Sequence, residues 1–197
     1  TLKSLNDFQK EALKDIKGSF KDNKVVLLHG VTSSGKTEVY VKLIEEYVNQ
    51  GKQALYLLPE IALTTQLISR LQAYFGEKVA VYHSKYNVQE RVEVWNNVLE
   101  NKPVAQIVIG ARSALFLPFN DLGLVIVDEE HESSFKQYDP APRYHARDAA
   151  IVLGNLHGSD ILLGSATPSV ESFYNVKVGK YGYAHIERRY GNVLMPD

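Results

Sequence analysis

Two groups of residues in this sequence have the types and the spacing needed to bind and cleave a nucleoside triphosphate. The first group follows the apolar run Val25-Val26-Leu27-Leu28 and reads Gly-Val-Thr-Ser-Ser-Gly-Lys-Thr. Glycines let backbone N–H groups turn inward around phosphate oxygens, a lysine reaches the outer phosphates, and a threonine binds Mg²⁺. A simple connecting turn is the alternative. We predict that ATP is bound by Gly30, Val31, Thr32, Ser33, Ser34, Gly35, Lys36 and Thr37.

The second group follows the apolar residues 122–127 and reads Asp-Glu-Glu-His at 128–131. A buried strand delivers these carboxylates to its carboxyl end, where Asp128 can hold Mg²⁺ and Glu129 can orient or deprotonate the attacking water. An acidic turn without chemistry is the alternative, and a lysine loop elsewhere in the chain argues against it. We predict that Lys36, Asp128 and Glu129 are catalytic and that Thr37 and Asp128 bind Mg²⁺.

Gln9 is a candidate for recognising the adenine base, because a side-chain amide can both donate to and accept from a base edge. It lies in a segment where Leu5, Phe8, Leu13 and Ile16 predict an amphipathic helix shortly before the phosphate loop. The alternative is that Gln9 is a solvated helix residue.

Polar residues also follow other predicted strands, at the edge where parallel α/β sheets bind ligands. Thr64 follows Pro59-Glu60 and is a candidate DNA contact, although capping of a helix is an equal alternative. Arg112 and Ser113 follow Gly110 and are suited to binding a phosphodiester, with a surface ion pair as the alternative for Arg112. Ser165 and Thr167 follow residues 161–164 and are candidates to hydrogen-bond the region of Asp128 and Glu129 and to relay whether the γ-phosphate is present.

Residues 133–148 combine aromatic and cationic side chains in a loop that the composition suggests is too polar for the core. Such surfaces bind single strands through stacking and phosphate contacts. An ordinary long loop with local packing is the alternative. We predict that this loop couples DNA binding to hydrolysis through Phe135, Lys136, Tyr138, Arg143, Tyr144 and His145.

The elements that must position these residues alternate along the chain. Apolar runs typical of buried strands occur at 25–28, 53–58, 79–84, 106–109, 122–127 and 161–164. Helical spacing occurs between several of them, including residues 88–100, where Trp95 is predicted to face the core. This alternation favours an α/β fold with a mainly parallel sheet. We assign residues 173–197 only to edge structure or a linker.

Composition limits the function classes. At 197 residues and 45% hydrophobic content, the chain is long enough for one domain with a full core. A net charge of −1 gives no global attraction to nucleic acid, and the absence of cysteine excludes disulfides and thiolate zinc sites from this chain. No apolar run is long enough to span a bilayer, so we expect no membrane partner and a cytoplasmic location. Because the chain starts with Thr1 and ends without a helix stop, we expect it to be part of a longer protein.

Together these motifs resemble the first motor lobe of superfamily 2 helicases, and among them the bacterial helicases that restart replication. Segments 58–64 (Leu-Pro-Glu-Ile-Ala-Leu-Thr) and 142–148 (Pro-Arg-Tyr-His-Ala-Arg-Asp) are the most specific matches. Ser33 stands where that family usually has glycine. Further matches lie at 30–40, 83–84, 109–116, 127–131 and 164–169.

The resemblance implies a RecA-like P-loop NTPase sandwich in which residues 1–190 form the ATP-binding lobe and 191–197 begin a linker to a second lobe. It implies an ATP- and Mg²⁺-dependent 3′ to 5′ DNA helicase, associated with the bacterial nucleoid, whose loop at 132–147 couples DNA to hydrolysis. Implied partners are forked or single-stranded DNA, primosome and helicase-loading proteins, and single-stranded DNA-binding protein. Zinc and the arginine finger are implied only for the missing part. The alternatives are a restriction-type or RNA-directed motor and a non-catalytic assembly module.

Overall fold

A computed structural model describes residues 4–31, 35–83 and 86–186 of the chain. Among these residues the strands form one seven-stranded sheet in the order β3-β4-β2-β5-β6-β1-β7, and every neighbouring pair is parallel. The predicted α/β class with a parallel sheet is therefore confirmed. The strands are β1 (Val25–Gly30), β2 (Gln53–Leu57), β3 (Val79–Tyr82), β4 (Ile107–Gly110), β5 (Leu122–Asp128), β6 (Asp160–Ser165) and β7 (Gly182–Ile186).

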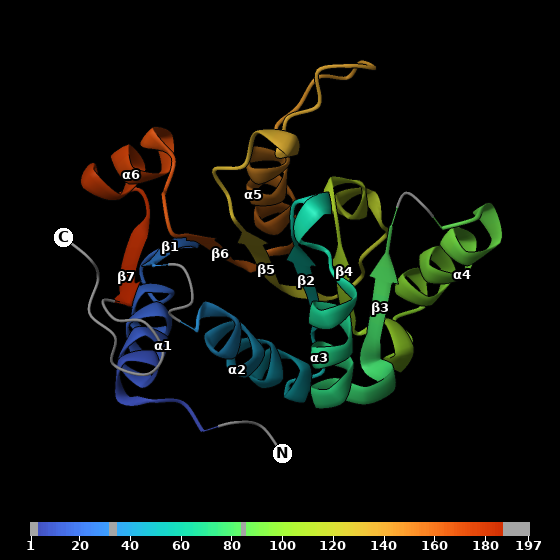
Figure 1. Cartoon of the computed structure of the whole chain (residues 1–197), viewed down its shortest axis with the longest axis horizontal. Helices are drawn as coiled ribbons and strands as arrows, with labels where there is room; N and C mark the ends of the chain where they lie inside the picture. Colours follow the sequence, from blue (N-terminus) through green and yellow to red (C-terminus); the bar gives the residue numbers. More distant parts are fainter. Residues whose placement is uncertain (1–3, 32–34, 84–85, 187–197) are drawn as a thin grey trace.

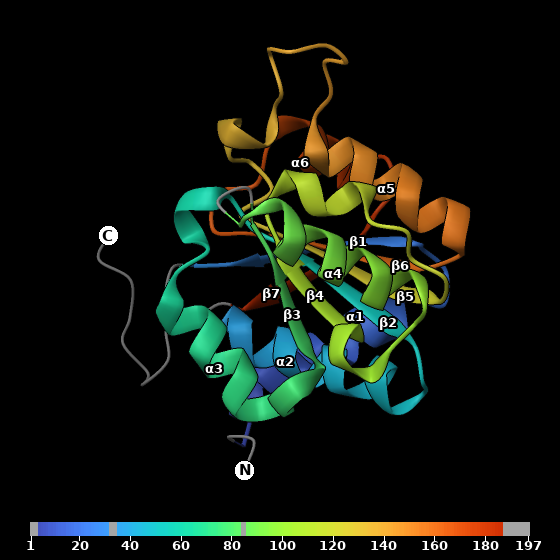
Figure 2. The ribbon, with the colours of Figure 1, turned by 90° about the vertical axis from the view of Figure 1, so that its right-hand side faces the viewer.

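Helices cover both faces of the sheet, as Figures 1 and 2 show. One face carries α1 (Asp7–Ser19), α2 (Lys36–Asn49) and α3 (Thr65–Phe75), and the other side carries α4 (Val88–Leu99), α5 (Ala146–His157) and α6 (Val170–Lys177). Single 3₁₀ turns occur at η1 (Glu60–Ala62), η2 (Gly76–Lys78), η3 (Pro103–Ala105), η4 (Arg112–Phe116) and η5 (Ser133–Phe135).

Two hydrophobic cores lie between the sheet and these helix layers. Successive residues of a strand alternate between them, so that Leu28 packs in the core under α1 and α2 while Leu27 packs in the core under α5. Because both faces of a parallel sheet are buried, its strands appear in the sequence as continuous apolar runs. That is why the central strands could be located from the apolar runs of the sequence.

Helix α4 corrects one expectation. Trp95 was predicted to face the core, but it is 42% exposed, together with Val88, Val92 and Leu99 on the same helix. Val98 is the buried residue of α4. The helix packs beside β3, the edge strand, so the sheet covers only part of its surface. Within the described ranges, no helix combines the length and apolar character needed to cross a bilayer.

Residues 136–145 form a projecting arm, and this name is used below for that segment. Figure 1 shows it extending away from the sheet and helices, immediately before α5. Lys136 and His145 form an antiparallel bridge at its base, and the Gln137 N–H donates to the Tyr144 carbonyl at 2.8 Å. Phe135, which precedes the arm, is buried in the core at 1% exposure. The expectation that the whole loop is too polar for the core is therefore wrong at Phe135, which anchors the loop and presents no stacking face.

Candidate nucleotide-binding and hydrolysis site

Lys36 is the first residue of α2 and lies over the end of β1. Its ammonium donates to the Gly30 carbonyl at 2.6 Å and contacts the Val31 carbonyl at 3.4 Å, and the residue is buried. Burial lowers the pKa of Lys36, while the charges of Asp128 and Glu129 raise it. The three predicted catalytic residues therefore lie within electrostatic range of one another. Thr37 is the next residue of the helix and is half-buried, whereas Thr32, Ser33 and Ser34 lie outside the described residues.

Gly35 joins the phosphate loop to α2 in a left-handed conformation, with φ of 83°. A side chain here would be strained, and its Cβ would collide with the Gln9 amide. Gln9 itself is fully buried: its Nε2 donates to the Gly35 carbonyl at 3.2 Å, and its Oε1 accepts from the Asn6 N–H at 2.9 Å. The solvated alternative for Gln9 is thus wrong. The side chain ties α1 to the phosphate loop, and its role toward adenine stays a prediction.

Asp128 ends β5 as a buried carboxylate held by two tyrosines. The Tyr40 hydroxyl donates to Oδ1 at 2.9 Å and the Tyr56 hydroxyl donates to Oδ2 at 3.1 Å. Burial raises the pKa of Asp128, and the nearby charge of Glu129 raises it further, while the tyrosine hydrogen bonds and Lys36 oppose the shift. Gly164 on β6 leaves room for this arrangement, because a Cβ there would collide with the Tyr40 hydroxyl.

Sequence reasoning missed Tyr40, Tyr56 and Gly164 as parts of the site. The available signal was chemical: a fully buried tyrosine needs a partner for its hydroxyl, whereas a phenylalanine does not. The partner, Asp128, could not be identified from local sequence.

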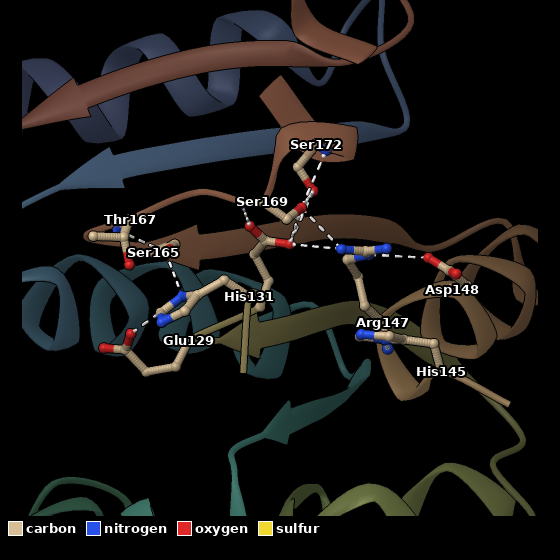
Figure 3. A network of polar contacts seen from close by, with 10 residues as sticks. Glu129, His131, His145, Arg147, Asp148, Ser165, Thr167, Ser169 and Ser172 are labelled. Carbon is tan, nitrogen blue, oxygen red and sulfur yellow. Dashed lines mark hydrogen bonds and ion pairs between the residues drawn. The ribbon is translucent and has the colours of Figure 1, made fainter. Parts of the chain in front are cut away.

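Glu129 follows Asp128 in an unusual backbone conformation, with φ of 52°. Its carboxylate lies 3.7 Å from His131 Nδ1, which is 2.7 Å from the Ser165 hydroxyl. Ser165 Oγ also accepts from the Thr167 N–H at 2.9 Å. Figure 3 shows this chain of contacts. Ser165 is thus connected to Glu129 through His131, and Thr167 is connected through Ser165. Their role in sensing nucleotide stays a prediction.

Glu130 was not singled out from the sequence, yet it is fully buried at the centre of a second polar network. Its carboxylate contacts Arg147, Ser169 and Ser172, all shown in Figure 3. Arg147 was likewise missed. The signal available in the sequence was a third acidic residue directly after the predicted catalytic pair.

The predicted DNA contacts lie around the arm. Arg112 Nη1 donates to the carbonyls of Ser134 and Lys136 at 3.3 and 3.1 Å, and Arg112 therefore fixes the base of the arm. These partners are carbonyl groups, so the contacts are not the surface ion pair considered as the alternative. The Lys136 ammonium lies 4.8 Å from the centre of the Tyr138 ring, which is 62% exposed. A cavity of about 410 Å³ lies between Pro59, Arg112 and Tyr138.

The remaining predicted contacts are partly structural. Arg143 is exposed and Tyr144 packs edge-on against Phe116, with ring centres 5.4 Å apart. Thr64 Oγ1 accepts from the Leu67 N–H at 3.3 Å and so caps α3, as the alternative for this residue proposed. His145 caps α5, because its Nδ1 accepts from the Arg147 N–H at 3.2 Å. Ser113 is half-buried in η4. DNA binding by these residues stays a prediction.

Comparison with known proteins gives a consistent result. The model of the DEAD/DEAH box helicase family matches residues 6–176. The chain is 43% identical over 195 residues to the replication restart protein PriA of Bacillus subtilis, covering 98% of this chain and 24% of that protein. It is 45% identical over 196 residues to PriA of Rickettsia felis, covering 100% of this chain and 29% of that protein. The chain therefore spans about a quarter of the length of these curated relatives.

Solved structures support the fold. RecG bound to a three-way DNA junction matches with a TM-score of 0.68 at 23% identity, over 96% of this chain and 25% of RecG. A hypothetical ATP-dependent RNA helicase from Sulfolobus tokodaii matches with a TM-score of 0.62 at 21% identity, over 93% of this chain and 53% of that protein. At these identities the likeness concerns the fold alone.

Proposed function

The chain belongs to the DEAD/DEAH box helicase family, and on this premise we propose that it is the first motor lobe of an ATP-dependent DNA helicase that restarts replication. Helicase domains of this kind use ATP and Mg²⁺. The observation that carries the proposal is that the Lys36 ammonium lies on the Gly30 carbonyl at the end of β1, and that the Asp128 carboxylate ends β5. Both strands pair in parallel with β6, so the two charged groups lie at the same end of the sheet.

The donor set at this end of the sheet fits Mg²⁺ and a triphosphate. Asp128 is buried, and its described hydrogen-bond donors are neutral: the two tyrosine hydroxyls and the Glu129 N–H. A buried carboxylate of this kind is stabilised by a nearby cation. Asp128 and Thr37 would hold the metal, and Lys36 and the loop N–H groups would hold the phosphates. Bound Mg²⁺ and ATP supply the electrophilic phosphorus and the leaving group.

Glu129 is the residue that acts on water in this proposal. It is partly exposed, with 36% of its side chain accessible, and is oriented by its own positive-φ backbone and by the His131 contact. In this position it orients the attacking water and accepts its proton. Gln9 would recognise adenine by exchanging one of its present hydrogen bonds for the base.

The arm and the cavity at its base are the proposed DNA-binding surface. Lys136, Tyr138 and Arg143 offer cations and an exposed ring, the combination that binds single strands. Thr64, Arg112 and Ser113 lie on the neighbouring loops and would contact the backbone. The effect of DNA binding on Asp128 and Glu129 would be transmitted by four residues: Tyr144, His145, Ser165 and Thr167.

The relatives' name, replication restart protein, supports a role in restarting replication. Forked DNA as the substrate and a 3′ to 5′ direction follow only from the family resemblance, and we propose both. On the same basis we propose primosome proteins, helicase loaders and single-stranded DNA-binding protein as partners, association with the nucleoid, and zinc elsewhere in the parent protein. An RNA-directed motor, the alternative, is not favoured, because the relatives at 43% and 45% identity are replication restart proteins.

The test measures ATP turnover by the full-length protein that contains this lobe, with and without forked DNA. Lys36→Ala and Glu129→Gln are each expected to lower the DNA-stimulated kcat by about 100-fold or more, since they remove a phosphate contact and the water-orienting group. Lys42→Ala, two turns into the same helix as Lys36, is the matched control and should retain wild-type turnover.

Two results contradict the proposal. Unchanged turnover in Lys36→Ala or Glu129→Gln excludes this site as the hydrolytic centre. Stimulation by RNA rather than by forked DNA favours the RNA-directed motor instead.

A further inference from the structure

A buried ion pair next to the hydrolytic residue connects three separate parts of the lobe. Glu130 is fully buried, and its two carboxylate oxygens receive four hydrogen bonds. Oε1 accepts from the Ser169 N–H at 2.6 Å, and Oε2 accepts from the Ser172 hydroxyl at 2.9 Å, the Ser169 hydroxyl at 3.0 Å and Arg147 Nη1 at 3.2 Å. Such a carboxylate is stable in the interior because it is hydrogen-bonded and paired with a cation.

Glu130 fixes the backbone at Glu129. Its N–H donates to the Gly164 carbonyl at 3.1 Å, which extends the pairing of β5 with β6 by one residue. Glu129 therefore lies between two held positions, Asp128 in the strand and Glu130 in the buried network. Its own φ of 52° is a sparsely populated conformation for a residue with a side chain, and such conformations persist only where the surroundings impose them. The direction of the Glu129 side chain thus depends on Glu130.

Arg147 connects this network to the arm. It lies in the first turn of α5, directly after the arm ends at His145, and is 8% exposed. One guanidinium nitrogen contacts both Glu130 and the Ser169 hydroxyl, the latter at 2.8 Å, while Nε donates to Asp148 at 2.9 Å. Figure 3 shows Arg147 lying between Asp148 on one side and Ser169 on the other. Because the guanidinium is planar and engaged on two edges, it cannot move independently of α5.

The base of the arm is also connected to the start of α5, through His145. His145 both pairs with Lys136 across the arm and accepts the Arg147 N–H at 3.2 Å. A displacement of the arm by a bound strand therefore shifts the start of α5, and with it the guanidinium of Arg147. Since interiors are close-packed, such a shift reaches Glu130 without being absorbed on the way.

We propose that Arg147 and Glu130 form a positioning pair that transmits the state of the arm to Glu129. Neither residue touches nucleotide or DNA in this proposal. The pair is separate from the His131–Ser165 contact, which reaches Glu129 from the other side. The inference rests on the proposed function, because it assumes that DNA on the arm stimulates hydrolysis at Glu129.

The experiment compares variants of the full-length protein by the stimulation factor, defined as kcat with saturating forked DNA divided by kcat without DNA. Arg147→Gln and Glu130→Gln are each expected to lower this factor about tenfold, while KM for ATP and Kd for DNA change by less than about twofold. The double variant should lose no more than either single variant, since the two residues act as a unit. Arg147→Lys should recover part of the loss because it keeps the charge and one hydrogen bond.

Controls separate this effect from loss of folding and from loss of DNA contacts. Glu171→Gln removes an exposed carboxylate from α6, between Ser169 and Ser172, and should keep the wild-type factor. Arg143→Gln removes an exposed arginine from the arm and should raise Kd for DNA, which gives the pattern expected of a lost DNA contact. If Glu130→Gln lowers Tm strongly, Ser172→Ala decides, because it removes one donor to Glu130 and should lower the factor about threefold.

Wild-type stimulation factors in Arg147→Gln and Ser172→Ala overturn the inference and leave the proposed function standing. A loss of stimulation that parallels a loss of DNA affinity also overturns it, since Arg147 would then act through binding. Absence of DNA stimulation in the wild-type protein overturns the proposed function and the inference together.

Discussion

Individual residues in this lobe serve the site through main-chain contacts as well as through charge. His145 is an example: its Nδ1 accepts the Arg147 N–H and begins α5, and its backbone pairs with Lys136 at the base of the arm. The cap requires the unprotonated ring nitrogen. Burial lowers the pKa of His145, and the charge of Arg147 lowers it further, which favours that form in the folded protein.

This shift predicts a pH-dependent stability. With a folded-state pKa below the ordinary 6.5, the contribution of His145 is complete above pH 6.5 and is lost as the pH falls from 6.5 through the lowered value. Asparagine accepts the same hydrogen bond without titrating, so His145→Asn should lose less stability between pH 7.5 and 5.5. Because His145 is only half-buried, solvent screens the effect. We therefore expect the fall in Tm between pH 7.5 and 5.5 to be about 2 °C smaller for His145→Asn than for the wild type. Thermal melts of both proteins check this, and equal changes in Tm would show that the cap does not titrate.

At the scale of elements, the central strands could be predicted because parallel strands buried on both faces leave continuous apolar runs. Strand β7 lies in the stretch assigned only to edge structure or a linker, and it is an edge strand whose residues alternate between buried and exposed. The apolar spacing of α4 identified a helix but not which side is covered, and Trp95 proved exposed. Local sequence could place Asp128 at a strand end. It could not show that Tyr40 and Tyr56, 88 and 72 positions away, converge on that carboxylate.

The arm is an element whose contribution to function can be separated from its contribution to stability. Its tip, residues 138–143, is exposed, and the pairing of Gln137 with Tyr144 closes the arm below it. Replacing 138–143 by Asn-Gly leaves a two-residue hairpin, for which this dipeptide is well suited. We expect Tm to change by less than about 2 °C, because no core residue is removed.

The same replacement should lower DNA-stimulated kcat by about tenfold or more, because the exposed ring and cations that bind the strand are lost. Paired melting curves and turnover assays on the full-length protein make this comparison. Full stimulation without the tip would assign DNA binding to the cavity at the arm base rather than to the arm.

For the whole molecule, the sheet places two different surfaces at neighbouring positions. The predicted nucleotide-binding residues lie at the ends of β1 and β5. The arm begins at Lys136, after β5 has ended at Asp128, and projects from the body of the lobe. Phe135, which directly precedes the arm, is buried in the core on the α5 side of the sheet and so anchors the arm to the body of the lobe. In the proposed motor, such a lobe supplies only one side of the active site. The chain spans about a quarter of the length of its curated relatives.

The isolated 197-residue chain is therefore expected to bind ATP without efficient turnover. The arginine that stabilises the transition state in such motors is worth about 10³ to 10⁵ in kcat, so the isolated lobe should be slower than the full-length protein by a factor of that order. Mg²⁺ and ATP should nevertheless raise its Tm, because a ligand that binds only the folded state stabilises it. Lys36→Ala should abolish that rise, since the ammonium over Gly30 is lost, whereas Lys42→Ala should retain it. Melts with and without Mg²⁺ and ATP, paired with phosphate release, measure both quantities. Rapid DNA-stimulated turnover by the isolated chain would mean that this lobe holds a complete catalytic site, contrary to the assignment of its missing arginine to another part of the protein.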